Sequence, residues 1–172
     1  FLIDTTEVTR GHFRNLMGWL PASNGEDCQN CPVGDVTWFD AVVFCNARSK
    51  RGGFDTVYSW ISATRDSLGS VVDLAGFATD ETKDGFRLPF EVEWEWASRG
   101  GLESRAWPWG DDSASVDFNA WSKGNAREIA KSVATKRPNG YGLYDMAGNV
   151  WELVGDRYAA YDLLGADTHV PL

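Results

Sequence analysis

The sequence predicts one compact α+β domain with much irregular backbone. Three observations support this. The chain has 172 residues, enough for a single domain with a sizeable core. Its 43% hydrophobic and 24% charged residues are typical of globular proteins. Helical periodicity is confined to the first hundred residues, whereas the chain beyond residue 101 is rich in Gly, Asn, Asp and Trp.

The first elements are predicted to be a short strand over residues 1–8 and a helix that begins after Thr9. The Thr9 hydroxyl can accept a hydrogen bond from the free amides of the first helical turn, and Gly18 ends the helix. Residues 21–32 are rich in turn formers and predict a loop.

A second helix is predicted after Thr37. Asp40 stands three residues further on, so the two residues resemble a capping box with an aspartate in the acceptor role. The apolar residues that follow supply a buried face, and the pair Gly52 and Gly53 supplies a left-handed end.

Two short strands, over residues 57–61 and 71–74, and a third helix, over residues 89–99, are predicted next. Two acids of this helix, Glu91 and Glu95, are four residues apart and share one face. They could serve as an acid–base pair, but Glu95 is also placed to pair with Arg99, and we favour this structural role.

The remainder of the chain predicts only short extended pieces, such as residues 132–134 and 148–151. Its charge balance is equally informative, because the formal net charge is −9 and the isoelectric point is near 4.6. Such a chain has no basic patch with which to bind nucleic acid. No apolar run is long enough for a transmembrane segment, and two histidines cannot form a three-histidine metal site.

The three cysteines predict one local disulfide. Cys28 and Cys31 form a C-x-x-C in a turn-rich loop that lacks the βαβ frame of a redox-active pair. Zinc would need a second cysteine pair, and Cys45 alone cannot supply it. We therefore favour a Cys28–Cys31 disulfide in an exported protein over two free thiols, with Cys45 as a buried thiol.

An acidic turn lies near the end of the chain, between Asp145 and Glu152. Two acids that flank a tight Gly-Asn turn can direct carboxylate and carbonyl oxygens toward one point, which suits a hard cation such as calcium. The spacing alone fits equally well a turn in which both carboxylates accept hydrogen bonds from backbone amides. Both interpretations stay open at this point.

The nine tryptophans are the most unusual feature of the composition. Aromatic side chains near Asp and Asn are common at sugar-binding surfaces, but they are also large core residues. For any single tryptophan we favour the core. Trp107 and Trp109 are the candidates for an exposed, ligand-binding pair.

Several stretches of the chain resemble the formylglycine-generating enzyme family, also called the sulfatase-modifying factor domain. The longest is Pro-Asn-Gly-Tyr-Gly-Leu-Tyr-Asp-Met-Ala-Gly-Asn-Val-Trp-Glu. The matching stretches follow the family's order over nearly the whole chain and comprise residues 4–9, 36–41, 87–97, 107–110 and 138–152. The resemblance implies a fold related to the C-type lectin-like fold, with helices packed on a small twisted sheet. It also implies a domain over residues 1–172 that is incomplete at its C-terminus.

The resemblance implies calcium as well. In the family, the acidic turn binds the ion through side chains that correspond to Asp145 and Glu152 and through carbonyls that correspond to Gly148 and Val150. A second calcium site uses an asparagine side chain and the next carbonyl, which fall on Asn119 and Ala120.

The enzymatic members of the family oxidise a sulfatase cysteine to formylglycine with a cysteine pair, copper and dioxygen. That pair lies in the family's C-terminal portion, and this chain has no cysteine beyond Cys45. We therefore expect a non-catalytic, calcium-stabilised, extracytoplasmic module that binds protein or glycan through loops around Trp107, Trp109 and Trp121. The alternative is a copper-dependent formylglycine-generating oxidase whose active-site cysteines lie beyond this chain.

Overall fold

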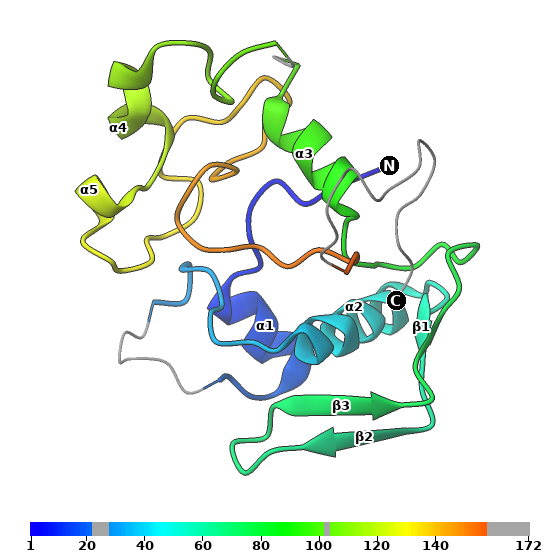
Figure 1. Ribbon diagram of the computed structural model, residues 1–172. Helices are drawn as coiled ribbons and strands as arrows, with labels where there is room; N and C mark the ends of the chain where they lie inside the picture. Colours follow the sequence, from blue (N-terminus) through cyan, green and yellow to red (C-terminus); the bar gives the residue numbers. More distant parts are fainter. Residues whose placement is uncertain (22–27, 102–103, 158–172) are drawn as a thin grey trace. The chain divides into compact units, whose positions relative to one another are not determined.

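The computed structural model describes residues 1–21, 28–101 and 104–157 (Figure 1). Its contacts divide the chain into two units. The first combines Phe1–Gly34 with Val92–Glu152, and the second combines Asp35–Glu91 with the described residues that follow Glu152. Residues 22–27 of the predicted N-terminal loop lie outside the described residues.

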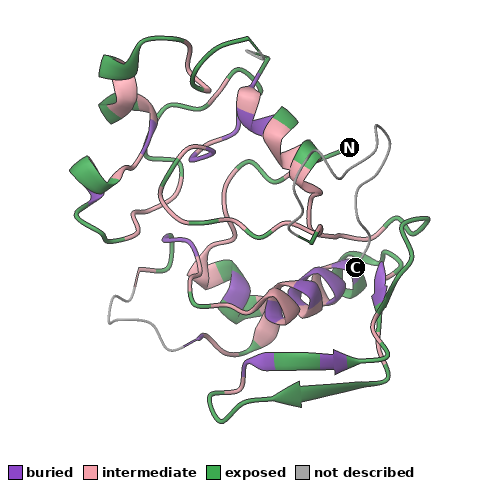
Figure 2. Ribbon diagram, viewed as in Figure 1, coloured by how far each residue is buried: buried purple, intermediate pink, exposed green. Residues whose placement is uncertain are grey.

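The second unit is a helix on two small antiparallel sheets of two strands each. Strand β2 (Ser62–Arg65) pairs with β3 (Val71–Ala75), and β1 (Tyr58–Ser59) pairs with β4 (Ala78–Thr79). Helix α2 (Trp38–Gly52) packs against β1 and β3. Figure 2 shows the buried stripe along α2. The core beneath it consists of Val42, Cys45, Val57, Tyr58, Val71 and Leu74.

The predicted capping box at the start of α2 is confirmed, and it also ties the helix to the sheet. The Thr37 hydroxyl accepts from the Asp40 amide at 3.0 Å, and Asp40 accepts from the Thr37 amide at 3.1 Å. Asp40 is fully buried, and its second oxygen accepts from the Val71 amide at 2.8 Å. A buried carboxylate that accepts hydrogen bonds from amides on both elements holds them in register.

The first unit has short helices joined by long irregular segments. They are α1 (Arg10–Met17), most of α3 (Glu91–Arg99), the 3₁₀ turn η1 (Ser113–Ser115), α4 (Val116–Asn119) and α5 (Lys123–Ala126). Its core contains Ala97, Leu143 and Met146, against which Ile3 and Trp94 pack. The predicted caps of α1 are confirmed, since Thr9 accepts from the His12 amide and Gly18 is left-handed.

Several predictions about the elements are wrong. Residues 1–8 form no strand, because their main chain pairs with irregular segments: the Thr5 carbonyl accepts from Tyr144, and the Val8 carbonyl accepts from Val33. The strand predicted over residues 57–61 ends after Ser59, and the next strand begins at Ser62.

The pieces at 132–134 and 148–151 are turns and irregular backbone, not strands. Helix α3 begins at Glu91, two residues later than predicted, and the Pro89 carbonyl accepts instead from the Gly155 amide. The predicted pair on α3 is confirmed, because Arg99 Nε donates to Glu95 at 2.7 Å. Helices α4 and α5 were not predicted, since four residues are too short to show helical periodicity.

Candidate metal centre

The acidic turn of residues 145–152 is held in an unusual backbone conformation. Asp145 and Asn149 have φ angles of 59° and 62°, in the left-handed region that few non-glycine residues adopt. Gly148 is required by space, since a Cβ there would lie 2.1 Å from the carbonyl oxygen of Trp121. The Asn149 amide donates to that same oxygen at 2.9 Å. Such conformations persist only where the surroundings impose them, and they gather at functional sites.

Asp145 is the most buried acid of this turn, with 2% of its surface exposed. Its Oδ2 accepts from the Ala134 amide at 2.7 Å, but its Oδ1 is buried without a hydrogen-bond partner. Burial raises the pKa of Asp145 above its ordinary value. A buried carboxylate oxygen without a donor is costly, and a bound cation would offset that cost.

Glu152 closes the turn on the side of α3. Its Oε2 accepts from the indole Nε1 of Trp94 at 2.8 Å. Burial is the main cause that raises the pKa of Glu152, and the charge of Asp145 adds to it. Asp145 is therefore removed from water and Glu152 is partly buried, and the two acids predicted from the sequence are within electrostatic range of one another.

Glu7 is a third acid at this site, which the sequence analysis did not identify. Its Oε1 accepts from Asn149 Nδ2 at 3.0 Å, although the two residues are 142 positions apart. Its Oε2 is buried without a partner. Burial, followed by the charge of Asp145, raises the pKa of Glu7 to about 8. Sequence spacing contains no signal for this contact, because only the tertiary fold brings the two segments together.

The residues of the turn fit a hard cation. Carboxylates and main-chain carbonyls are the ligands that calcium prefers, and no sulfur or imidazole intervenes. Within residues 1–21, 28–101 and 104–157, no three Asp, Glu, His or Cys side chains are arranged to hold a metal ion by themselves. An ion at the turn would therefore also need main-chain oxygens, such as those of Gly148 and Val150, and water.

The two residues predicted for a second calcium site lie at the end of α4. Asn119 Nδ2 donates to the Ser115 carbonyl at 2.8 Å, and the Ala120 carbonyl accepts from Asn125 Nδ2 at 3.0 Å. Both groups thus take part in hydrogen bonds within this segment. Calcium at Asn119 and Ala120 stays a prediction.

The predicted tryptophan pair is stacked at the surface. The rings of Trp107 and Trp109 are 5.6 Å apart at an interplanar angle of 7°, and Trp107 is 44% exposed. Trp107 and Gly110 exchange two main-chain hydrogen bonds of 3.0 Å, and Trp109 Nε1 donates to the Asp112 carbonyl. The loop therefore presents a rigid aromatic surface.

Trp121, the third predicted ligand-binding residue, has internal contacts on its ring. The Lys136 ammonium lies 3.8 Å from the ring centroid, and Nε1 donates to the Thr135 hydroxyl at 2.9 Å. Its carbonyl oxygen supports the acidic turn, as described above. The structure thus places Trp121 beside the metal-centre residues and not in the stacked pair.

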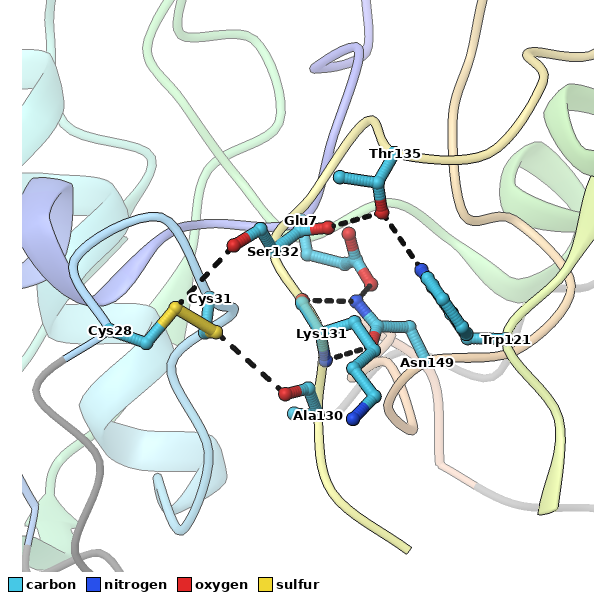
Figure 3. The surroundings of a disulfide bond; sticks show 9 residues. All are labelled: Glu7, Cys28, Cys31, Trp121, Ala130, Lys131, Ser132, Thr135 and Asn149. Atoms are coloured by element: carbon cyan, nitrogen blue, oxygen red, sulfur yellow. Dashed lines mark hydrogen bonds between the residues drawn. A yellow bond between two sulfur atoms is a disulfide. The ribbon is translucent and has the colours of Figure 1, made fainter. Parts of the chain in front are cut away.

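The predicted disulfide is confirmed, with the sulfurs of Cys28 and Cys31 2.04 Å apart. Figure 3 shows that it lies against residues 130–132, where the Ser132 hydroxyl and the Ala130 carbonyl contact its two sulfurs. The remaining thiol, Cys45, is buried in α2. These three cysteines do not fit a copper site with two free thiolates. The oxidase alternative places its active-site cysteines beyond this chain, and it therefore stays a prediction.

The fold and the acidic turn define a small α+β domain with few helices and a small antiparallel sheet. Residues 1–170 match the family described as "Sulfatase-modifying factor enzyme 1-like domain", and the chain belongs to this family. No helix in the described part of the chain is long and apolar enough to cross a membrane.

Two curated relatives show how much of the family's length is present. "Chaperone protein LppX" of Paenibacillus barcinonensis is 33% identical over 171 residues, which cover 88% of this chain and 60% of the relative. "Inactive C-alpha-formylglycine-generating enzyme 2" of Bos taurus is 41% identical over 164 residues, which cover 90% of this chain and 42% of the relative. The chain thus spans about half the length of these relatives.

Two solved structures confirm the predicted fold class. "Treponema denticola variable protein 1" superposes with a TM-score of 0.73 at 34% identity, covering 89% of this chain and 61% of that chain. The structure of CarF superposes with a TM-score of 0.67 at 30% identity, covering 91% and 68%.

Proposed function

We propose that this chain is a non-catalytic, calcium-stabilised module of an exported protein, and that it binds protein or glycan. The observation that carries the calcium part is the buried, unpartnered Oδ1 of Asp145 in a turn of strained backbone. In this proposal the side chains of Asp145 and Glu152 and the carbonyls of Gly148 and Val150 bind the ion. Calcium would neutralise acids that are otherwise buried without a counter-charge.

The stacked pair of Trp107 and Trp109 supports the binding role. An exposed, rigid indole supplies apolar area at a small entropic cost, which suits the apolar face of a sugar ring or an aliphatic side chain of a protein. In this proposal Trp121 does not contact the ligand through its ring face, since that ring is already covered by Lys136, and it supports the binding loops instead.

Three further observations support a non-catalytic, exported module. The disulfide is typical of proteins from oxidising compartments. One relative with 41% identity carries the word "Inactive" in its name, and a structural neighbour at 34% identity is called a "variable protein". The cysteines of this chain leave no free pair for copper.

Calcium binding is tested by thermal unfolding of the full chain with excess chelator or with calcium. Binding to the folded state alone adds about 2.7 kcal/mol at a hundredfold excess over Kd. For a domain of this size we expect a rise of roughly 5–10 °C in Tm. Asp145→Asn and Glu152→Gln should each abolish the rise, and titration calorimetry should show the same loss of binding.

Asp73→Asn is the matched control, because it removes the same charge from an exposed position on β3. It should keep the full calcium response. A wild-type Tm that is identical in chelator and in calcium, with no heat of binding, would remove the calcium part of the proposal.

The binding surface is tested with immobilised glycans and peptides probed by the calcium-loaded chain. We expect Trp107→Ala to weaken binding at least about tenfold, because the variant loses an exposed ring whose apolar surface would be buried by the ligand. Trp96→Ala, at a 53% exposed position on α3, is the control and should bind as the wild type does. Equal binding by both variants would show that the ligand contacts another surface.

A further inference from the structure

Glu7 is a partly buried acid, with a buried Oε2, that the proposed function leaves unused. We infer that Glu7 is a further carboxylate of the calcium centre, and that it faces the ion from the N-terminal segment beside Asp145. This inference rests on the proposed calcium centre at residues 145–152. Its basis is the placement of Glu7 and the unpartnered oxygens that it shares with Asp145.

The N-terminal segment is fixed beside the acidic turn through Thr5 and through Glu7 itself. The Thr5 carbonyl accepts from the Tyr144 amide at 2.9 Å, directly before Asp145. Glu7 itself is held through Asn149 Nδ2 at 3.0 Å. The Asn149 side chain also binds the Lys131 main chain, as acceptor from its amide at 2.8 Å and as donor to its carbonyl at 3.2 Å (Figure 3). The Glu7 carboxyl is therefore fixed in direction.

The oxygens that Glu7 and Asp145 do not use in these contacts are buried together. Glu7 Oε2 and Asp145 Oδ1 both lack a hydrogen-bond partner, and the two carboxyl groups are close enough to interact directly. When both groups are ionised, two carboxylates this close, away from water, repel strongly. Asp145 is 2% exposed, so water does not relieve that repulsion.

Lys136 does not supply the missing positive charge. Lys136 has a favourable but minor effect on Asp145. Its ammonium donates to the Asp117 carbonyl and covers the Trp121 ring, 3.8 Å from the centroid. A cation bound at Asp145 would neutralise both carboxylates at once. The two carboxylates together would place two negative charges beside the ion, which favours a divalent ion over a monovalent one.

The competing explanation is a single proton shared by Glu7 and Asp145, with no role for Glu7 in metal binding. Glu7→Gln separates the two. The amide oxygen can still accept from Asn149 Nδ2, and the amide nitrogen can donate to Asp145 Oδ1. We expect the metal-free variant to unfold at a higher temperature than the metal-free wild type. Its affinity for calcium, measured by titration calorimetry, should fall at least about tenfold.

Glu7→Asp provides a second variant that keeps the charge and withdraws the oxygens by one methylene. We expect weaker calcium binding here too, without the gain in metal-free stability. Glu128→Gln is the matched control, because its side chain is 72% exposed and pairs only at the surface with Lys123. It should leave calcium affinity unchanged.

The outcomes distinguish a role of Glu7 in metal binding from the existence of the calcium centre at residues 145–152. If Glu7→Gln binds calcium as the wild type does, while Asp145→Asn does not bind, Glu7 is structural and the inference is wrong although the calcium centre stands. If the wild type binds no calcium by calorimetry, both are wrong. Loss of binding in Glu7→Gln, with retained binding in Glu128→Gln, supports the inference.

Discussion

Asp145 concentrates several unfavourable features in one residue of the acidic turn. Asp145 combines a left-handed backbone, near-complete burial and an oxygen without a donor. Each of these features costs free energy in the isolated fold. Natural sequences tolerate such conflicts mainly at functional sites, where a ligand relieves them.

The metal-free protein should lose stability as the pH rises. The folded state raises the pKa of Glu7 from 4.5 to about 8, and it raises those of Asp145 and Glu152. A raised pKa means that the folded chain binds the proton more tightly than the unfolded chain. The stabilisation is therefore complete below the ordinary pKa and is lost as the pH passes the folded pKa.

We expect Tm in chelator to fall between about pH 5 and about pH 8, since this is the window of the Glu7 shift. Saturating calcium should oppose this trend, because the ion binds the ionised carboxylates. Melting curves at four pH values, with and without calcium, measure both. A metal-free Tm that rises over this window would contradict the burial of these acids.

At the scale of elements, the segment of residues 130–135 connects the disulfide to the acidic turn. On one side it contacts both sulfurs, and the Val133 amide donates to the Asn30 carbonyl at 2.9 Å. On the other side Lys131 binds Asn149, and the Ala134 amide donates to Asp145. The disulfide loop therefore supports the residues of the candidate metal centre through one irregular segment.

Replacing both Cys28 and Cys31 by serine should weaken both stability and calcium binding. In the loop-entropy account, a disulfide that closes a loop of about four residues contributes about 2 kcal/mol, which corresponds to roughly 4–8 °C in Tm. Calcium affinity should fall as well, because residues 130–135 lose an anchor. Calorimetry and melting curves of the double variant measure the two effects. Unchanged calcium affinity would show that the segment is held without the disulfide.

The helix ends could be predicted from local sequence, whereas the extended N-terminal segment could not. The ends of α1 and α2 were predicted from Thr9, Thr37 and two glycines, because caps act within one helical turn. Residues 1–8 were predicted wrongly, because the hydrogen-bond partners of an extended segment come from elsewhere in the chain. Here the partners are a turn and a loop, so no strand forms.

At the scale of the whole molecule, the family match covers both units, since it runs from residue 1 to residue 170. Each unit has its own core, one beneath α2 and one around α3. The chain covers 60% and 42% of the two curated relatives described above. The similarity therefore does not extend the activity of a whole family member to this chain. The proposed role is therefore limited to calcium binding and to the surface around Trp107.

The sequence by itself determined the family, the α+β class, the helix caps, the disulfide and the acids Asp145 and Glu152. All of these depend on residue order or on short spacings, which can be read along the chain. Only the tertiary structure brought Glu7 to the turn, covered Trp121 with Lys136 and stacked Trp107 on Trp109. The physical reason is that burial and contact between distant segments are set by how the chain folds, and no local pattern contains them.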